Sequence, residues 1–167
     1  MELYILRHGE TEENIQHILQ GHTDGHLTEL GRQQAHDAGK LLRGIHFDAF
    51  LCSDLKRCTD TAEIINTFLE MNIQTTPLLR ERDWGSVTGE IVDANHRIVV
   101  PDDAETVPAM KARARVFLDY VADTYAGKRV LAVSHGLICR CLQAVHYEKE
   151  LAEVDRMKNA EYRILNL

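Results

Sequence analysis

Two histidines in this sequence each follow a short apolar run and precede a glycine. Leu3 to Leu6 leads into Arg7-His8-Gly9, and Val130 to Val133 leads into Ser134-His135-Gly136. Such runs, rich in strand-forming residues and bounded by glycine, are typical of strands buried on both faces. Arg and His are poor core residues, so this repeated arrangement indicates function more than packing. Because ligands of open α/β sheets bind beyond the carboxyl ends of strands, we expect both imidazoles to face one crevice.

Arg57 adds a further positive charge near the same predicted edge. It follows a second apolar run, Phe47 to Cys52, and falls in the first turn of a predicted helix. A helix N-terminus already favours anions, so a cation there is poor for the helix but good for phosphate binding. With Arg7 it supplies two permanent cations beside two imidazoles, and guanidinium groups match phosphate oxygens well. One imidazole can attack phosphorus while the arginines and the other, protonated histidine stabilise developing charge.

None of these four residues is well placed to give a proton to a departing alkoxide. Glu81 is the best candidate for that general acid, provided that its segment folds over the site. Its neighbours in Arg80-Glu81-Arg82 also allow a simpler interpretation, a surface ion pair worth little. Likewise, His8 or His135 taken alone is more often a structural histidine, and Arg57 alone is more often a solvated surface charge.

The spacing of the remaining apolar residues predicts the elements that position this set. A helix is expected from Thr28 to Gly44, with Leu30, Ala38, Leu41 and Leu42 facing the core. Ser53-Asp54 is expected to cap the helix that carries Arg57. The other expectations are a short strand at 73–76 ended by Pro77, an irregular segment at 78–104, a helix capped by Thr106 and closing at Gly127, a helix at 137–146, an ambiguous charged region at 149–158, and a final strand at 162–167. This order predicts a single α/β domain, residues 1–167, built as a three-layer α/β/α sandwich on a mostly parallel sheet.

Composition narrows the range of partners. A formal net charge of −7 argues against nucleic acid and membrane surfaces, which need a basic face. No apolar stretch approaches the roughly 20 residues that span a bilayer, and the N-terminus lacks the features of a secretory signal, so we expect a cytoplasmic protein. The four cysteines form no C-x-x-C pair and are expected to be reduced core thiols. The histidines lack H-x-H or H-E-x-x-H spacing, so we expect no metal and no other cofactor.

Motifs along nearly the whole chain resemble those of the histidine phosphatase superfamily, also called the phosphoglycerate mutase-like family. The agreement comprises Arg7-His8-Gly9-Glu10-Thr11, Asn14, Gln20-Gly21, Leu27-Thr28-x-x-Gly31-x-x-Gln34-Ala35, Ser53-Asp54-Leu55-x-Arg57-x-x-x-Thr61-Ala62, Leu79-Arg80-Glu81, Glu105-Thr106 and Val133-Ser134-His135-Gly136. The resemblance implies that His8 is the nucleophile that becomes phosphohistidine and that Glu81 is the proton donor. It also implies a phosphate pocket of Arg7, Arg57 and His135 with Asn14 nearby, and we expect Gln20, Gly21 and Gly136 to contribute to substrate binding. The chain departs from the family pattern at His26, near Ile18, at 86–89, at Ala104 and at Thr106, which changes the rim of the site and leaves the natural substrate open.

Three functions fit these observations. The first is a metal-independent phosphomonoesterase, of histidine acid phosphatase type, that acts on small phosphorylated metabolites through phosphohistidine. The second is a cofactor-dependent mutase of the phosphoglycerate type, and the third is a non-catalytic module that binds a phosphorylated ligand. A binder has no need of a nucleophile together with an acid. A mutase must shield its phosphohistidine from water with a lid. Segment 83–104 and a chain that stops at Leu167 leave little to build one, and although Trp84 and His96 could shape one wall, we expect water to reach phosphorus. Hydrolysis is therefore the expected reaction, while the oligomeric state stays open.

Overall fold

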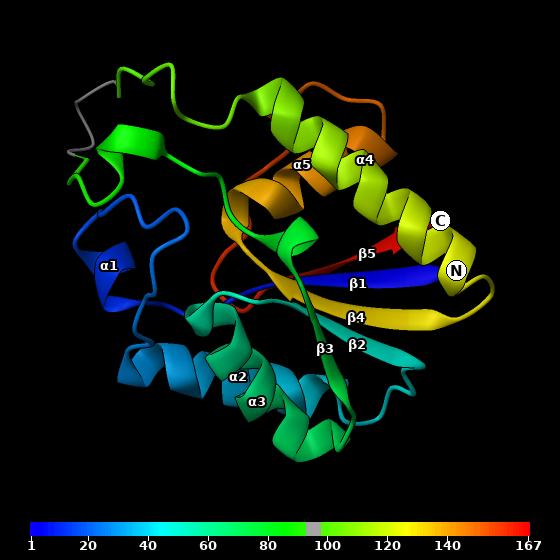
Figure 1. Ribbon diagram of the computed structural model, residues 1–167. Helices are drawn as coiled ribbons and strands as arrows, with labels where there is room; N and C mark the ends of the chain where they lie inside the picture. Colours follow the sequence, from blue (N-terminus) through cyan, green and yellow to red (C-terminus); the bar gives the residue numbers. More distant parts are fainter. Residues whose placement is uncertain (93–97) are drawn as a thin grey trace.

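The computed structural model describes residues 1–92 and 98–167 (Figure 1). Within them lies a five-stranded sheet in the order β3-β2-β4-β1-β5. Four strands run parallel and β5 runs antiparallel to β1 at the edge. The strands are β1 (Glu2–Arg7), β2 (Ala49–Ser53), β3 (Ile73–Thr76), β4 (Arg129–Ser134) and β5 (Tyr162–Asn166). The mostly parallel sheet expected from the sequence is confirmed.

Helices cover both faces of this sheet (Figure 1). The helices are α1 (Glu12–Ile15), α2 (Glu29–Leu42), α3 (Lys56–Leu69), α4 (Val107–Thr124) and α5 (Gly136–His146), with short 3-10 turns at Pro77–Leu79, Gly85–Val87 and Leu151–Glu153. Strand β1 shows why two helical layers form, because Leu3 and Ile5 pack with α4 and α5 while Tyr4 and Leu6 pack with α2 and α3. A strand buried on both faces needs cover on both, so the three-layer prediction is confirmed. No helix of the described residues is long and apolar enough to cross a membrane.

Helix α2 has the predicted extent and cap, but its predicted core face is partly wrong. Leu30 and Leu41 are 55% and 70% exposed. The buried residues are Gly31, Ala35, Ala38, Gly39 and Leu42. Small residues face inward because α3 packs closely, and a Cβ added to Gly39 would lie 2.4 Å from the ring of Phe68. Ala38 and Leu42 are confirmed as core residues, whereas Gly31, Ala35 and Gly39 are not in the predicted face.

The N-cap of α3 is also corrected by the structure. The capping position is Leu55, which makes no side-chain cap, and not the predicted Ser53-Asp54 pair. The two polar side chains are engaged elsewhere: Ser53 Oγ lies 2.8 Å from Nε2 of His135, and Asp54 pairs with Arg80 at 2.7 and 2.6 Å. Arg57 nonetheless lies in the first turn of α3, as predicted.

The later elements follow the sequence closely. Thr106 caps α4 by accepting a hydrogen bond from the backbone N–H of Ala109, although this helix ends at Thr124, before Gly127. The described parts of segment 78–104, residues 78–92 and 98–104, are largely irregular, and Ile91 forms an isolated bridge with Ile18. His96 lies outside the described residues. All four cysteine thiols are buried and free.

A close approach of two glycines joins the loop after β1 to the start of α2. A Cβ on Gly31 would lie 2.0 Å from the carbonyl oxygen of Glu10, and a Cβ on Gly9 would lie 2.4 Å from that of Gly31. Both obstacles are backbone atoms, which cannot rotate away. This contact sets how α2 packs beside the chain segment that carries His8.

We therefore expect Gly31→Ala to destabilise the protein. Forcing the two backbone segments apart should lower the free energy of unfolding by about 1–3 kcal/mol. Urea denaturation measures the change, with Gly44→Ala as a control because nothing lies within 4 Å of a Cβ added there. The control should shift stability by less than about 1 kcal/mol. Equal stability of Gly31→Ala and the wild type would contradict the tight contact.

Candidate active site

The ends of three neighbouring strands bring the predicted chemistry together. Strand β4 lies between β1 and β2, with Arg7 opposite Ser134 and Cys52 opposite Val133. The backbone N–H of His8 also donates to the carbonyl of Ser134 at 2.9 Å. The parallel register therefore delivers His8, His135 and the start of α3 to one edge of the sheet.

His8 is a buried imidazole with a defined tautomer. Its side chain is nearly enclosed at 3% exposure, and Nδ1 lies 2.7 Å from the carbonyl oxygen of Gly9. A carbonyl only accepts, so Nδ1 carries the proton and Nε2 keeps its lone pair. Burial, reinforced by the charges of Arg57 and Arg7, holds the pKa of His8 well below its usual value. His8 is thus neutral near pH 7, the form that a nucleophile requires.

His135 stands beside it, with the two ring centroids 5.3 Å apart in an edge-on arrangement. Its Nε2 lies 2.8 Å from Oγ of Ser53 and 3.3 Å from Sγ of Cys58. Burial first, and then the charge of Arg57, holds the pKa of His135 well below its usual value. A phosphate dianion between these groups would favour the protonated form, because an opposite charge stabilises it.

Arg57 is buried, Arg7 is half-buried, and the buried Nε of each has no acceptor among the described residues. Arg57 is 1% exposed and donates from its two terminal nitrogens to the carbonyls of Thr23 and Gly21, both at 2.8 Å. Arg7 donates to the carbonyl of Met157 at 2.7 Å. Within the described part of the chain nothing accepts from Nε of either arginine, although both atoms are buried. Unsatisfied buried cationic donors are costly, and an anion held between them removes that cost.

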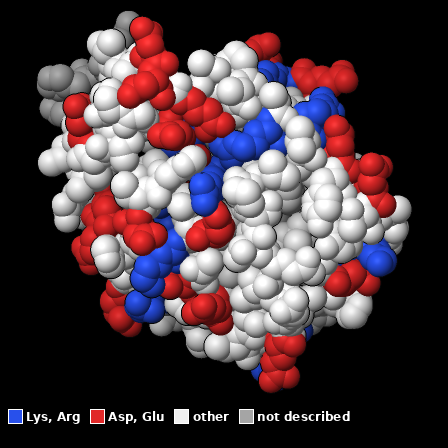
Figure 2. Space-filling view, in the orientation of Figure 1, with Lys and Arg blue, Asp and Glu red and all other residues white. Residues whose placement is uncertain are grey.

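The described residues show no large positive patch on the face of the molecule seen in Figure 2. Figure 2 shows acidic side chains spread over the face seen in Figure 1, with Lys and Arg in a few groups. The net charge of −7 agrees with that distribution. The cations that could hold a phosphate are therefore placed locally, at the half-buried Arg7 and the buried Arg57.

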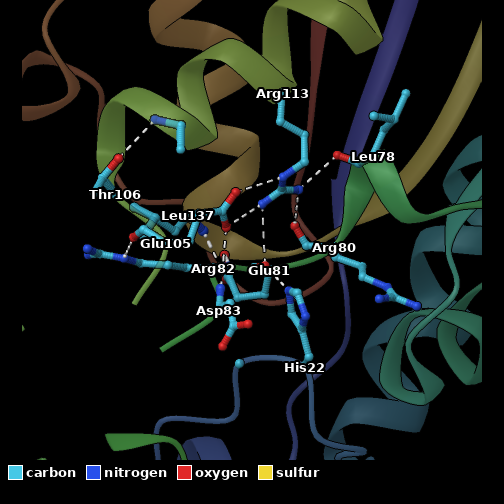
Figure 3. A network of polar contacts seen from close by, with 12 residues as sticks. His22, Leu78, Arg80, Glu81, Arg82, Asp83, Glu105, Thr106, Arg113 and Leu137 are labelled. Carbon is cyan, nitrogen blue, oxygen red and sulfur yellow. Dashed lines mark hydrogen bonds and ion pairs between the residues drawn. The ribbon is translucent and has the colours of Figure 1, made fainter. Parts of the chain in front are cut away.

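Glu81 does lie over this edge, and both of its carboxyl oxygens are engaged (Figure 3). Oε2 accepts from the backbone N–H of Leu137, in the first turn of α5, at 3.1 Å. Oε1 accepts from the backbone N–H of Arg82 at 2.9 Å. The carboxyl group is therefore held at the helix that begins directly after His135, and it is not merely a surface ion pair.

Of the four other predicted binding residues, Gly21 and Gly136 lie against the arginines. Asn14 Oδ1 accepts from the backbone of Thr11 and from Nδ2 of Asn159, both at 3.2 Å. Gln20 is buried, and its Oε1 has no partner among the described residues. Gly21 has a φ of 52°, and its carbonyl holds Arg57. A Cβ on Gly136 would lie 3.2 Å from Nε of Arg7, so this glycine leaves room for the guanidinium.

Several contributors to the site were not anticipated. The loop before β5 supplies the Met157 carbonyl to Arg7, and Asn159 donates to the carbonyl of His8 at 3.2 Å. Met157 lies in the charged region 149–158, which has no clear pattern, and Asn159 directly follows that region. His22 contacts the backbone carbonyl of Glu81 through Nε2 at 2.9 Å. Ser53 is a polar residue at the end of a buried strand, the same signal that marks Arg7, and it contacts His135 instead of capping α3.

A separate hollow of about 400 Å³ lies at the opposite end of the sheet. Its lining includes Met1, Lys128 and Leu167, which flank the starts of β1 and β4 and the end of β5. The imidazoles lie beyond the other ends of β1 and β4. This hollow therefore has no part in the candidate site.

The two buried imidazoles should make the protein less stable in acid. Their folded-state pKa values are well below 6.5, so the unfolded chain binds these protons at higher pH than the folded chain. Stability is then full above pH about 6.5 and falls as the pH drops toward the folded-state pKa values, by up to about 1.4 kcal/mol per pH unit for each histidine.

Urea unfolding between about pH 7.5 and 5 measures this dependence. His135→Gln removes one titrating group and should give a shallower curve than the wild type. Identical slopes for the two proteins would contradict the assignment of the effect to His135.

Comparison with known proteins agrees with this geometry. Residues 3–167 match the family model of the histidine phosphatase superfamily (branch 1). The uncharacterised phosphatase PhoE of Bacillus subtilis (strain 168) is 34% identical over 142 residues, covering 83% of this chain and 73% of PhoE. The probable phosphoglycerate mutase GpmB of Yersinia pestis (strain Pestoides F) is 32% identical over 157 residues, covering 85% of this chain and 73% of GpmB.

The fold is likewise shared with solved structures. A mycobacterial glucosyl-3-phosphoglycerate phosphatase in complex with VO3 superimposes with a TM-score of 0.89 at 26% identity, covering 99% of this chain and 92% of that one. The family match spans almost every residue, including both His-Gly strand ends. The resemblance seen in the motifs is therefore confirmed, and the chain belongs to the histidine phosphatase superfamily.

Proposed function

We propose that this protein is a phosphomonoesterase of small phosphorylated metabolites, with residues 1–167 forming one catalytic domain that works through phosphohistidine and without a metal. The single observation that carries the proposal is the state of His8. Its Nδ1 is bonded to the Gly9 carbonyl, its pKa is lowered, and it lies among Arg7, Arg57 and His135. The phosphatases and the mutase among its relatives support phosphoryl transfer as the reaction class.

In the first step Nε2 of His8 attacks phosphorus and the bond from phosphorus to the ester oxygen breaks. Glu81 gives that oxygen a proton, so the leaving group departs as an alcohol. The phosphorylated ring is cationic, and the Gly9 carbonyl stabilises it by accepting from Nδ1–H at 2.7 Å. Arg7, Arg57 and protonated His135 stabilise the charge that builds on the three remaining phosphate oxygens.

In the second step water attacks the phosphohistidine. Glu81, now ionised, takes a proton from that water, the bond between phosphorus and nitrogen breaks, and inorganic phosphate leaves. His8 returns to the neutral form that its surroundings favour. Each group thereby regains its starting state.

A panel of phosphate esters assayed with EDTA present tests this function. We expect inorganic phosphate from at least one small ester, because no three His, Cys, Asp or Glu side chains of the described residues are grouped to hold a metal. Inactivity that Mg²⁺ or Zn²⁺ reverses would contradict a metal-free mechanism.

One substrate also separates a phosphatase from a mutase. With 3-phosphoglycerate and catalytic 2,3-bisphosphoglycerate we expect any reaction to yield inorganic phosphate. Rapid formation of 2-phosphoglycerate with negligible phosphate would overturn hydrolysis and leave the role of His8 intact.

A further inference from the structure

Arg113 on α4 uses every hydrogen-bond donor that a guanidinium has (Figure 3). Its Nη1 donates to the carbonyls of Leu78 and Arg80 at 2.9 and 2.7 Å. Its Nη2 donates to the Glu81 carbonyl at 3.4 Å and to Oε2 of Glu105 at 2.8 Å, and its Nε donates to Oε1 of Glu105 at 2.9 Å. One side chain therefore holds three carbonyls within four consecutive residues.

Glu105, the carboxylate partner of Arg113, holds the chain on the other side of Glu81. Its Oε2 accepts from the backbone N–H of Asp83 at 3.3 Å, and its own N–H donates to the Asp83 carbonyl at 2.8 Å. Its carbonyl accepts from Nε of Arg82 at 2.7 Å. The Glu105–Arg113 pair thus hydrogen-bonds to the backbone both before and after Glu81.

These contacts matter because the backbone around Glu81 has no helix or strand hydrogen bonds to hold it. Residues 80–84 belong to no helix or strand. The side chains of Arg113 and Glu105 are each only 17% exposed, so their bidentate pair is largely shielded from water. Shielded, bidentate pairs hold geometry far better than exposed ones.

We propose that Arg113, paired with Glu105, is a positioning residue that fixes the Glu81 carboxyl against the start of α5. The inference rests on the acid role proposed for Glu81. Arg113 does not itself serve the reacting atoms: its donors end on backbone carbonyls and on Glu105. Its effect on catalysis should therefore pass through Glu81 and appear only where Glu81 matters.

Arg113→Lys tests this role while conserving charge. A lysine has one nitrogen, which cannot bridge three carbonyls and two carboxylate oxygens. We expect kcat/KM for an alkyl phosphate to fall about 10- to 100-fold, the scale of a small displacement of a catalytic group. The value for p-nitrophenyl phosphate, whose leaving group needs little protonation, should fall much less.

A double-mutant cycle with Glu81→Gln gives the decisive measurement. If Arg113 acts only through Glu81, adding Arg113→Lys to Glu81→Gln should cause no further loss on the alkyl ester. Additive losses in the double variant, or equal losses of Arg113→Lys on both esters, would overturn the positioning role. If Glu81→Gln is still selective for the alkyl ester, the proposed function stands in that case. An unselective Glu81→Gln would overturn both the acid role and this inference.

Two further variants guard against a simple loss of folding. Arg115→Ala removes an arginine from the same helix whose contact is the distant Val145 carbonyl at 3.3 Å, and it should leave both esters unaffected. Glu105→Gln disrupts the pair from the other side and should reproduce the selective loss, so it replaces Arg113→Lys if that variant does not fold. If both variants are folded at the assay temperature and neither shows a larger loss of kcat/KM on the alkyl ester than on the aryl ester, the proposal is refuted.

Discussion

Replacing His8 with alanine should reduce turnover to background and abolish covalent labelling. Removing a catalytic nucleophile typically costs on the order of 10⁶-fold in kcat. Among residues 1–92 and 98–167, no other residue offers the same combination of a neutral imidazole, a proton fixed on Nδ1 by a backbone carbonyl and two adjacent guanidinium groups. The measurement is brief exposure to a ³²P-labelled ester followed by quenching. Wild-type protein should carry label that is acid-labile and alkali-stable, as a phosphoramidate is.

The matched control is His46→Ala, which removes a histidine whose side chain is 86% exposed at the far end of the sheet. It should label and turn over like the wild type. Label that resides on Ser134, or full activity of His8→Ala, would disprove the assignment. Retained labelling in His135→Ala together with slower turnover would agree with a role for His135 in charge stabilisation, because that residue need not form the covalent bond.

The four central residues of the site could be predicted because two simple rules apply to them. A buried parallel strand produces a continuous apolar run, and parallel strands end at one edge of the sheet. Arg7-His8 and His135 follow such runs directly, and Arg57 follows one by a single helical turn. Their convergence therefore follows from topology, without knowledge of any contact.

Other parts of the fold and site depend on contacts that leave no local pattern. Leu30 and Leu41 have the spacing of a core face, but the glycines of α2 let α3 approach so closely that the leucines point outward. The Met157 carbonyl meets Arg7 across 150 positions of sequence, and a backbone carbonyl is the same for every residue type. Arg113, likewise, looks like an ordinary charged helix residue until the carbonyls of 78–81 are placed around it.

Glu81→Gln should slow the hydrolysis of alkyl phosphates by roughly 10²- to 10⁴-fold, the usual range for loss of a general acid. Aryl phosphates should lose much less, because a nitrophenolate departs without a proton. Glutamine keeps the size of the side chain and can still accept the N–H of Leu137 through its amide oxygen, but its NH2 group cannot accept the N–H of Arg82. Loss of that contact should affect both ester types alike, so the difference in kcat/KM between them reports the loss of the proton.

The proposed mechanism uses one carboxyl group, that of Glu81, in both halves of the reaction. Helix α5 starts directly after His135, and Glu81 accepts from its first turn, so the acid and the phosphate pocket share one rigid element. In the proposed mechanism Glu81 gives its proton to the departing alcohol and then accepts a proton from the attacking water.

Glu90→Gln is the matched control for this experiment, because it removes an exposed carboxylate from the same segment. It should leave both ester types unchanged. Equal losses of Glu81→Gln on alkyl and aryl esters would mean that Glu81 only orders the loop or the substrate. In that case the proton must come from elsewhere, and His22, whose Nε2 already contacts the Glu81 carbonyl at 2.9 Å, would be the next residue to replace.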